Sequence, residues 1–462
     1  MSGHEMGQTQ RRVAPRRRAI QWVLALPLIG VLALAGCTWA GAGGGTGEGT
    51  VTVAIVANPQ MRDIQELTDA FERDHPDVKI RYVTLPENEA RARITQDVAT
   101  KAGQFDVVMI GTYEAPIWGR NGWLTDLTPY ARDDRDYDVD DLMPAVRKGL
   151  SVGDKLYATP FYGESSFLMY RKDLFEQAGL QMPERPTWTQ VAEFARKLKT
   201  PDRAGICLRG LPGWGEQLAP LNTVINTFGG RWYDEQWNAQ LTAPATAKAV
   251  KFYLDLIKEA GEPGAPNAGF SECLTAYSQG QAAMWYDATV AAGSLEDRKV
   301  SKVVGKNGYV AAPVMETKWS GWLWAWSLAV PTTAKDPDAA WDFVSWATSK
   351  EYIRMVGERL GWTRVPPGSR LSTYEIDDYV DASSGAAEVT LDALRTIDPN
   401  KATKEPVPYT GIQYVQIPEF QDLGTSVSQQ FAAVLAGNQS VDEALKTAQS
   451  EAEAVAEDGY KD

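Results

Sequence analysis

Three tryptophans occupy every second position of one short apolar stretch, SGWLWAWSLAV, which covers residues 320–330. If this stretch is an extended strand, its side chains alternate between two faces, so that Trp322, Trp324 and Trp326 share one face. Indole rings offer flat apolar area, and each ring nitrogen needs a hydrogen-bond partner when it is buried. The pattern therefore predicts either a stacked aromatic core or a platform for a ligand with apolar faces and hydroxyl groups, such as a sugar or a sugar alcohol.

Histidine and cysteine are too scarce for several common kinds of active site. The chain has two histidines, His4 and His75, and His75 lies where a helix is expected to end, so a site that depends on a catalytic histidine is not expected. No cluster of cysteine and histidine has the spacing of a zinc site. The sequence therefore predicts no metal and no cofactor. Acidic residues are plentiful, so a glycosidase with two carboxylates stays open as an alternative.

The first residues have the pattern of an export signal. Five arginines between residues 11 and 18 precede an apolar run over residues 19–36, as in a secretory leader. The run is about as long as a membrane span, so a permanent anchor helix is the alternative. The motif LAGC at residues 34–37 resembles the bacterial lipobox, in which the cysteine is lipidated and the chain is cut before it.

This motif predicts how the chain is held outside the cytoplasm. We expect a lipoprotein signal peptide over residues 1–36 and a lipid on Cys37, which would anchor the protein to the outer face of the cytoplasmic membrane. The glycine-rich residues 37–50 would form a flexible tether. In such an oxidising compartment Cys207 and Cys273 can form one disulfide, and two buried thiols are the alternative.

Composition and charge set the class of the remaining chain. The 462 residues are enough for two or three domains, and 44% of them are hydrophobic, as in globular proteins. The formal net charge of -14 argues against a nucleic-acid partner, which would require basic patches.

Strand and helix patterns alternate after the expected tether. They follow one another at residues 51–56, 63–76, 78–85, 89–103 and 105–111. This order predicts an α/β fold with a parallel sheet that is covered on both faces. Ligands of such sheets meet the carboxyl ends of the strands. Asn58, which follows the first strand, and Tyr113 and Glu114, which follow the third, are therefore candidate binding residues.

A second α/β region is expected further along the chain. Helix patterns cover residues 187–200, which begin with a capping threonine, and residues 244–261. Strand patterns cover residues 204–210 and 281–287, and the last hundred residues are mostly helical in pattern.

Longer stretches resemble a known family. DKLYATPFYGESSFLMYRKDLFEQAGL at residues 154–180 and AAWDFVSWATSKEYIRMVG at 339–357 resemble segments of the extracellular solute-binding proteins of carbohydrate ABC importers, the maltose-binding-like family 1. Five more stretches resemble the polyol-binding branch, which serves sorbitol and mannitol importers; they lie at 105–124, 207–216, 286–297, 361–370 and 406–421. The resemblance covers about residues 50–457.

The resemblance implies a type II periplasmic-binding-protein-like fold, with two α/β lobes that close on a ligand across three hinge crossings. Lobe 1 would hold residues 51–163 plus 324–374, and lobe 2 residues 164–323 plus 375–462, with crossings near 162–165, 320–324 and 373–377. It also implies a monomeric binding protein, not an enzyme, that delivers a hexitol or pentitol to ABC transporter permease subunits. A mono- or oligosaccharide is the alternative ligand, and a secreted carbohydrate-active enzyme is the alternative class.

A sugar alcohol carries many hydroxyl groups and no charge, so its site needs carboxylate and amide acceptors, arginine donors and indole faces. Besides Asn58, Tyr113 and Glu114, the residues expected to contact it are Glu164, Arg209, Trp214, Trp285, Asp287, Trp322, Trp324, Arg364 and Tyr414. Trp326, deeper in its strand, is expected to stay in the core.

Each of these expectations has a structural alternative. Glu164 could cap a hinge, Trp285 and Asp287 could form a solvated strand end, Trp214 could belong to a plain turn, and Arg209 could serve a structural ion pair.

Overall fold

Two β-sheets organise the chain in the computed structural model, which describes residues 49–461. The larger sheet has the strand order β2-β1-β3-β10-β6, and the smaller has the order β8-β7-β9. The strands of the larger sheet are β1 Thr50–Val56, β2 Lys79–Leu85, β3 Val107–Ile110, β6 Thr159–Glu164 and β10 Trp324–Ala329. The remaining strands are β4 Ser151–Val152, β5 Lys155–Leu156, β7 Ser166–Arg171, β8 Met284–Ala288 and β9 Asn307–Ala311.

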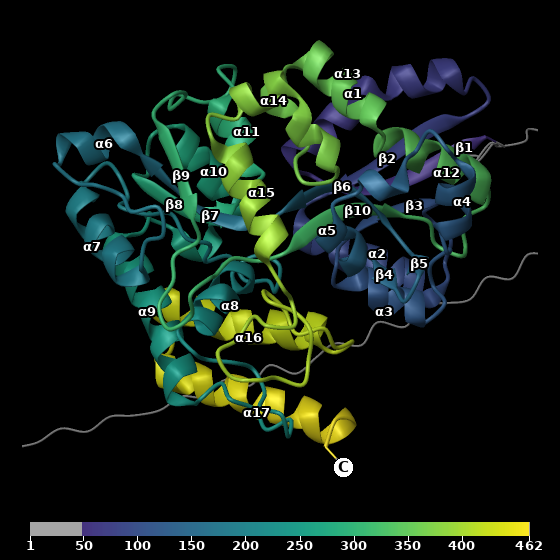
Figure 1. The fold of residues 1–462 in the computed structure, drawn as a ribbon. Coiled ribbons are helices and arrows are strands. Elements are labelled where there is room, and N and C mark those ends of the chain that lie inside the picture. The colour runs from purple at the N-terminus through teal and green to yellow at the C-terminus, as the bar shows by residue number, and fades with distance from the viewer. Residues whose placement is uncertain (1–48, 462) are drawn as a thin grey trace, which may run out of the picture. The chain divides into compact units, whose positions relative to one another are not determined.

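The larger sheet begins as the alternating pattern predicts. β1 pairs in parallel with β2 and with β3, because helices connect them across the faces of the sheet. Figure 1 shows α1 on one side of this sheet and α2 and α3 on the other. The sheet is mixed rather than all parallel, since β10 returns from far along the chain and pairs antiparallel with both β3 and β6.

One strand predicted from the sequence is absent beside the smaller sheet. Residues 204–210 do not form a strand but make only isolated bridges, from Ala204 and from Cys207 to the region of β8. The reason lies in the partners of their backbone. The Cys207 N–H donates to Met284 in β8, whereas the Gly205 N–H donates to Ala260 at the end of a helix, so no continuous ladder forms.

Helices make up most of the remaining chain. The helices that precede β9 in the chain are α1 Pro59–Asp74, α2 Glu87–Thr100, α3 Glu114–Arg120, α4 Thr128–Asp133, α5 Pro144–Gly149, α6 Lys172–Gln177, α7 Trp188–Leu198, α8 Leu218–Thr227, α9 Pro244–Ala260, α10 Phe270–Ser278 and α11 Ala291–Glu296. Those after β10 are α12 Pro337–Ala347, α13 Lys350–Leu360, α14 Asp377–Ala382, α15 Ala386–Thr396, α16 Phe420–Leu435 and α17 Val441–Gly459. Short 3-10 turns are η1 Val139–Asp141, η2 Ala265–Asn267, η3 Trp362–Arg364 and η4 Leu371–Glu375.

The start of α7 shows how local sequence sets a helix boundary. Thr187 was expected to cap this helix, and its Oγ1 accepts a hydrogen bond from the Gln190 N–H at 3.2 Å. In return the Gln190 side chain accepts one from the Thr187 N–H at 2.9 Å, which completes a capping box.

The chain changes sheets at two places that matter for the site. β6 ends at Glu164 and β7 begins at Ser166, so Ser165 alone links the larger sheet to the smaller one. The chain returns between the end of β9 at Ala311 and the start of β10 at Trp324. Glu164 and Trp324 therefore lie at junctions between the two sheets.

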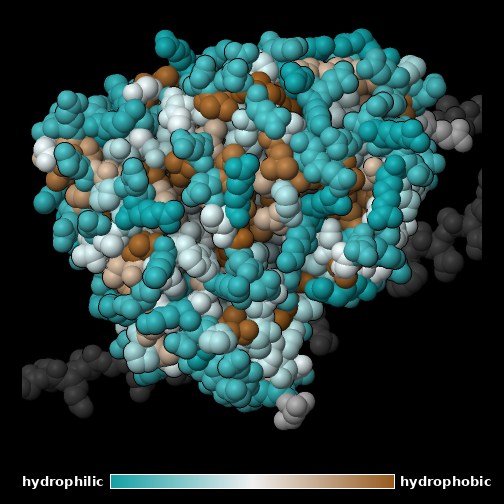
Figure 2. All heavy atoms as spheres, in the orientation of Figure 1, coloured by the Kyte–Doolittle hydropathy of each residue, from teal (hydrophilic) through white to brown (hydrophobic). Residues whose placement is uncertain are grey.

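Most large apolar side chains of the described residues are buried in the core. Among these residues only Val300 and Val380 are large hydrophobic side chains with substantial exposure. Figure 2 shows hydrophilic side chains over most of the visible face, with apolar ones scattered between them. Residues 49–461 contain no helix that is both long and apolar enough to span a membrane. The expected signal peptide, Cys37 and most of the tether lie outside the described residues.

Candidate functional site

A cavity of about 420 Å³, counting its solvent-open part, is lined by strands of both sheets and by the helices and loops beside them. The lining residues are Asn58, Glu87, Arg91, Tyr162, Glu164, Arg209, Trp214, Gly215, Ala219, Phe270, Ala288, Val290, Trp322, Trp324, Trp326 and Gln413.

The pairing of β6 with β10 sets one wall of this cavity. Trp324 lies opposite Glu164, and Trp326 lies opposite Tyr162. Residues directly opposite each other in an antiparallel pair project from the same face of the sheet. Two indoles, a carboxyl group and a phenol therefore face the cavity together.

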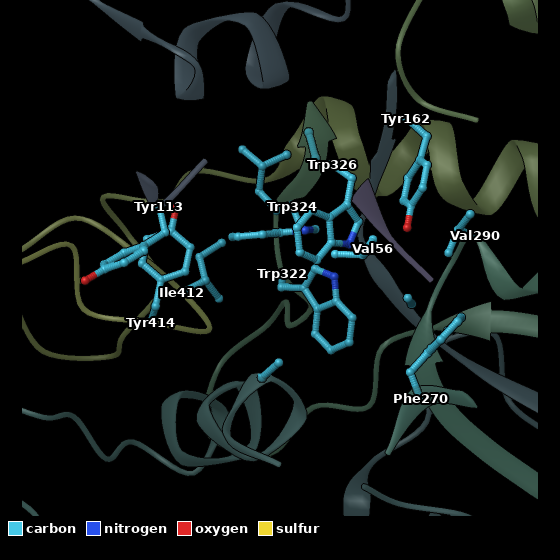
Figure 3. Close-up of a cluster of buried hydrophobic side chains, with 14 of the residues drawn as sticks. Val56, Tyr113, Tyr162, Phe270, Val290, Trp322, Trp324, Trp326, Ile412 and Tyr414 are labelled. Carbon is cyan, nitrogen blue, oxygen red and sulfur yellow. The ribbon is translucent and has the colours of Figure 1, made fainter. Parts of the chain in front are cut away.

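All three tryptophans of the opening stretch line the cavity, including Trp326, which was expected to remain in the core. They are buried all the same, because only 2–5% of each residue is exposed. Figure 3 shows the three indoles together, with Tyr113 and Tyr414 on one side and Tyr162, Val290 and Phe270 on the other. The three rings are thus buried core residues that also line the cavity.

Arg91 on α2 is packed against three of these aromatic rings. Its guanidinium carbon lies 4.1 Å from the ring centre of Trp214, 4.8 Å from that of Trp324 and 4.6 Å from that of Trp326. The guanidinium group also donates to Glu114 at 2.5 Å and to Glu87 at 3.0 Å. Stacking on rings and bonding to carboxylates together fix this side chain at the cavity wall.

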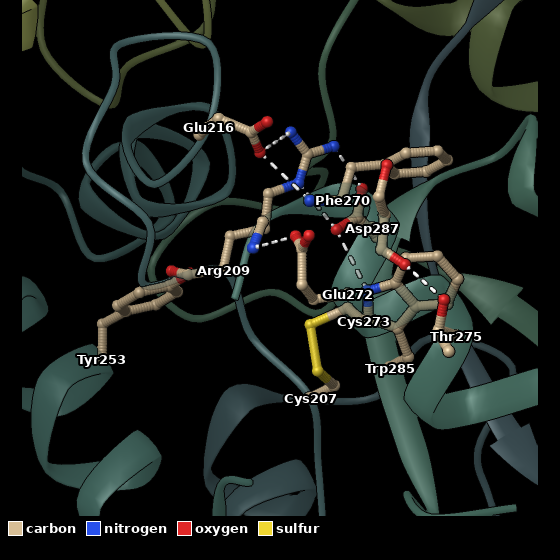
Figure 4. The surroundings of a disulfide bond; sticks show 12 residues. Cys207, Arg209, Glu216, Tyr253, Phe270, Glu272, Cys273, Thr275, Trp285 and Asp287 are labelled. Atoms are coloured by element: carbon tan, nitrogen blue, oxygen red, sulfur yellow. Dashed lines mark hydrogen bonds and ion pairs between the residues drawn. A yellow bond between two sulfur atoms is a disulfide. The ribbon is translucent and has the colours of Figure 1, made fainter. Parts of the chain in front are cut away.

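Arg209 is held by a second pair of carboxylates. Its Nε and Nη2 donate to the two oxygens of Asp287 at 2.8 and 2.5 Å, and its Nη1 donates to Glu216 at 3.3 Å. The Trp285 indole N–H donates to the same Asp287 carboxylate at 3.0 Å. Figure 4 shows this network around Arg209. Asp287 and Trp285 do not line the cavity but position the arginine that does.

A disulfide joins Cys207 to Cys273 beside this network. Cys207 precedes Arg209 by two residues, and Cys273 lies on α10, the helix that begins with Phe270. The Arg209 guanidinium carbon lies 5.2 Å from the Phe270 ring centre. The disulfide therefore ties together the two segments that bring Arg209 and Phe270 to the cavity, as Figure 4 shows.

Four buried polar atoms on cavity-lining residues have no hydrogen-bond partner among the described residues. Two are acceptors, Glu164 Oε2 and Gln413 Oε1, and two are donors, the indole nitrogens of Trp214 and Trp322. An unsatisfied buried polar group costs about 1–3 kcal/mol, and such groups are few in native proteins. A ligand with hydroxyl groups suits this set, because each hydroxyl both donates and accepts.

Burial raises the pKa of Glu164 well above its ordinary value. The positive charge of Arg209 opposes the increase, and the negative charges of Asp287 and Glu87 add to it. The carboxyl group that faces Trp324 is therefore harder to ionise than one in water, until a ligand supplies donors to it.

Four further candidates lie outside the cavity lining. Tyr113 and Tyr414 pack behind the wall, with ring centres 4.8 Å and 6.1 Å from that of Trp214. Glu114 bonds to Arg91, as described above. Arg364 contacts Asp63 and Glu66 on α1 instead.

Six of the twelve candidate binding residues thus line the cavity: Asn58, Glu164, Arg209, Trp214, Trp322 and Trp324. Sequence reasoning missed Arg91, Phe270 and Gln413. A glutamate four residues before an arginine is a common surface pair on helices, so Glu87 and Arg91 gave no signal of a cavity. Gln413 lies within residues 406–421, which resemble the polyol-binding branch, but the residue predicted to contact the ligand there is its neighbour Tyr414.

Residues 58–353 match the model of the bacterial extracellular solute-binding protein family. The chain belongs to this family. It is 48% identical over 403 residues to a mannitol-binding protein of Pseudomonas aeruginosa, which covers 87% of this chain and 91% of the relative. It is 23% identical over 329 residues to an erythritol/L-threitol-binding protein of Mycolicibacterium smegmatis, covering 67% of this chain and 68% of the relative.

Solved structures agree with this membership. A solute-binding protein of an ABC transporter from Agrobacterium vitis S4, with bound D-mannitol, matches with a TM-score of 0.87 and 50% identity, covering 89% of this chain and 99% of that one. A second, from Agrobacterium radiobacter K84 in complex with ribitol, matches with a TM-score of 0.78 and 26% identity, covering 88% and 98%. The expected type II periplasmic-binding-protein fold is confirmed.

Proposed function

We propose that this protein captures a sugar alcohol, most simply a hexitol such as D-mannitol, and delivers it to the permease subunits of an ABC importer. The observation that carries the proposal is the cavity wall, where unpartnered donors and acceptors stand beside three indole faces. The mannitol-bound relative from Agrobacterium vitis S4, which shares 50% of its sequence with this chain, supports the same ligand class.

The chemistry of the wall suits an open-chain polyol. Its C–H groups would lie against Trp322, Trp324 and Trp326, while its hydroxyl groups would donate to Glu164 and Gln413 and accept from the indole nitrogens. Hydrogen bonds to a charged group are roughly twice as strong as neutral ones. A dissociation constant of about 1 μM corresponds to about -8 kcal/mol, which a few such bonds and apolar burial can supply.

Two lobes would close around the ligand, with the boundaries given by the sequence analysis. Residues Tyr113 and Tyr414 support such closure, because they join segments far apart in the chain. The Tyr113 hydroxyl donates to the Ile417 carbonyl at 2.9 Å, and the Tyr414 hydroxyl bonds to Thr112 at 3.1 Å. A ligand that contacts both lobes binds the closed form better and so shifts the population toward it.

The family consists of extracellular binding proteins, and we infer that this chain turns over no substrate. We also propose that it acts as a monomer, without metal or cofactor, and that a lipid on Cys37 holds it at the outer face of the cytoplasmic membrane. Replacing Cys37 by alanine would then release the protein from the membrane fraction, which immunoblotting of cell fractions would detect.

The function is tested with the protein that begins at Thr38, since the described residues 49–461 lie within one compact unit. Melting temperature and titration calorimetry would be measured with D-mannitol, D-sorbitol, ribitol, D-glucose and maltose. We expect stabilisation and micromolar binding by a sugar alcohol, with glucose and maltose much weaker. If only a saccharide bound, the ligand would be a sugar rather than a sugar alcohol. Turnover of any ligand would overturn the assignment as a binding protein.

A further inference from the structure

We propose that the same cavity also binds amino alditols, open-chain polyols in which a primary ammonium group replaces one terminal hydroxyl, with the ammonium group beside Glu164. The inference rests on the proposed polyol site and adds a cationic class of ligand to it.

The arginines of the cavity are already neutralised by other carboxylates. Arg91 pairs with Glu87 at 3.0 Å and with Glu114 at 2.5 Å. Arg209 pairs with Asp287 at 2.5 Å and with Glu216 at 3.3 Å. Glu164 forms no salt bridge with any residue in the described part of the chain, and its Oε2 has no hydrogen-bond partner there.

Carboxyl groups outnumber guanidinium groups around the cavity. Five carboxyl groups, those of Glu87, Glu114, Glu164, Glu216 and Asp287, face two guanidinium groups, those of Arg91 and Arg209. Burial raises the pKa of Glu164 and of Glu216, and a nearby cation favours the ionised form of such a carboxyl group, whereas a nearby anion disfavours it. The cavity should thus accept an ammonium group and reject a carboxylate or a phosphate.

The burial of Glu164 indicates where in the cavity the ammonium group would bind. Its pKa is raised by loss of solvent, an effect that a cation at the carboxyl group would reverse. An ammonium group has three donors and no acceptor. Two unpartnered acceptors, Glu164 Oε2 and Gln413 Oε1, belong to residues that line the cavity and can receive these donors.

Three ligands of equal chain length isolate the charge: D-mannitol, 1-amino-1-deoxy-D-mannitol and D-mannonate. At pH 7 the amine is protonated, since the pKa of a primary alkylammonium is near 10. Calorimetric titration of the wild-type protein should give dissociation constants for the amine within about tenfold of mannitol, and at least about 100-fold weaker binding of mannonate.

Two variants show whether Glu164 is responsible. Glu164→Gln keeps the shape and removes the charge, so it should weaken the amine at least about tenfold more than it weakens mannitol. Glu235→Gln, an exposed carboxylate outside the cavity, should change neither. Circular dichroism and melting temperature would establish that both variants are folded.

The outcomes separate this inference from the proposed function. Mannitol binding with an amine as weak as mannonate, or an equal loss of both ligands in Glu164→Gln, would overturn the inference and leave the function. Amine binding without mannitol binding would overturn the polyol assignment and keep the cationic site. If none of the three ligands bound, both the inference and the proposed function would be overturned.

Discussion

Arg91 and Arg209 line the same cavity, and each guanidinium group is held by two carboxylates and packed against aromatic rings. They differ in where these partners come from. Arg209 takes Asp287 from β8 of the smaller sheet, in a network tied by the nearby disulfide. Arg91 takes carboxylates from α2 and α3 beside the larger sheet, but it also stacks on Trp214, which lies close in sequence to Arg209.

Under the proposed closure of two lobes, this difference separates contacts that exist before closure from contacts that form on closure. The network of Arg209 is complete on one side of the cavity, so it should persist when the two sides move apart. The contact between Arg91 and Trp214 joins the two sides, so it should form only on closure. Substitutions in the Arg209 network are therefore expected to cause a large loss of stability, whereas substitutions at the contact of Arg91 with Trp214 are expected to weaken binding with little loss of stability.

The largest effect is expected from Asp287→Ala. The Asp287 side chain is fully buried and accepts two bonds from Arg209, so its loss leaves a buried guanidinium group with a weaker partner. We expect about 3–5 kcal/mol of lost unfolding free energy, measured by urea denaturation, and at least about tenfold weaker mannitol binding.

The matched change at the other arginine is Glu114→Ala. Arg91 keeps its bonds to Glu87 and its ring contacts, so the loss of stability should be clearly smaller. Equal losses in the two variants would contradict the distinction between the arginines.

Removing the disulfide tests how much this covalent cross-link contributes to the stability of the Arg209 network. In the double variant Cys207→Ser and Cys273→Ser, a cross-link between residues 66 apart is lost. Chain entropy predicts about 4 kcal/mol of lost stability, measured by urea denaturation. Because Asp287 still holds Arg209, mannitol affinity of the folded variant should stay within about threefold. Loss of binding in a folded variant would show that the disulfide, not Asp287, positions the arginine.

A smaller effect is expected from pH. Burial raises the pKa of Glu216 to about 7, and the negative charge of Glu87 adds to the increase. The folded protein therefore binds this proton more tightly than the unfolded chain. The resulting stability is fully present below the unfolded pKa of about 4.3 and is lost as pH rises through 7.

Glu216→Gln should remove this pH dependence, which amounts to at most about 3 kcal/mol between pH 4 and pH 8. Urea denaturation at several pH values measures it, with the exposed Glu235→Gln as the control. A slope that is unchanged in Glu216→Gln would assign the effect to another group.

The smallest effect is expected at the contact between the two sides. Trp214→Phe keeps an aromatic ring near Arg91 but removes the indole nitrogen and part of the ring face. Mannitol affinity should fall about threefold to tenfold, with less than about 1.5 kcal/mol of lost stability.

Trp188→Phe is the matched control for this change. The indole nitrogen of Trp188 is also buried without a partner among the described residues, but Trp188 does not line the cavity. Its replacement should leave calorimetric affinity unchanged. A similar loss of affinity in both variants would mean that general loosening, and not the contact with Arg91, weakens binding.

The sequence predicts those parts of the fold that local patterns control. β1 and β2 fall within a residue of the expected strands, and Thr187 caps its helix as expected. The alternation of Trp324 and Trp326 also has its expected consequence, because β10 places alternate residues on one face, whereas Trp322 precedes this strand.

Long-range pairing accounts for what the sequence did not predict. Residues 204–210 have a strand pattern, but their backbone bonds go partly to α9, which no local pattern reveals. Arg91 becomes part of the site only because rings from two distant segments stack on it. Asp287 was placed in the ligand site because it ends a strand, whereas its carboxylate is used to hold Arg209.

Titration of the protein's intrinsic tryptophan fluorescence with D-mannitol tests the central claim most directly, since four tryptophans line the cavity. The account predicts a saturable change in emission with a micromolar dissociation constant, and a weaker response in Glu164→Gln. A protein that melts cooperatively but shows no change in emission or melting temperature with mannitol, sorbitol or ribitol would contradict it.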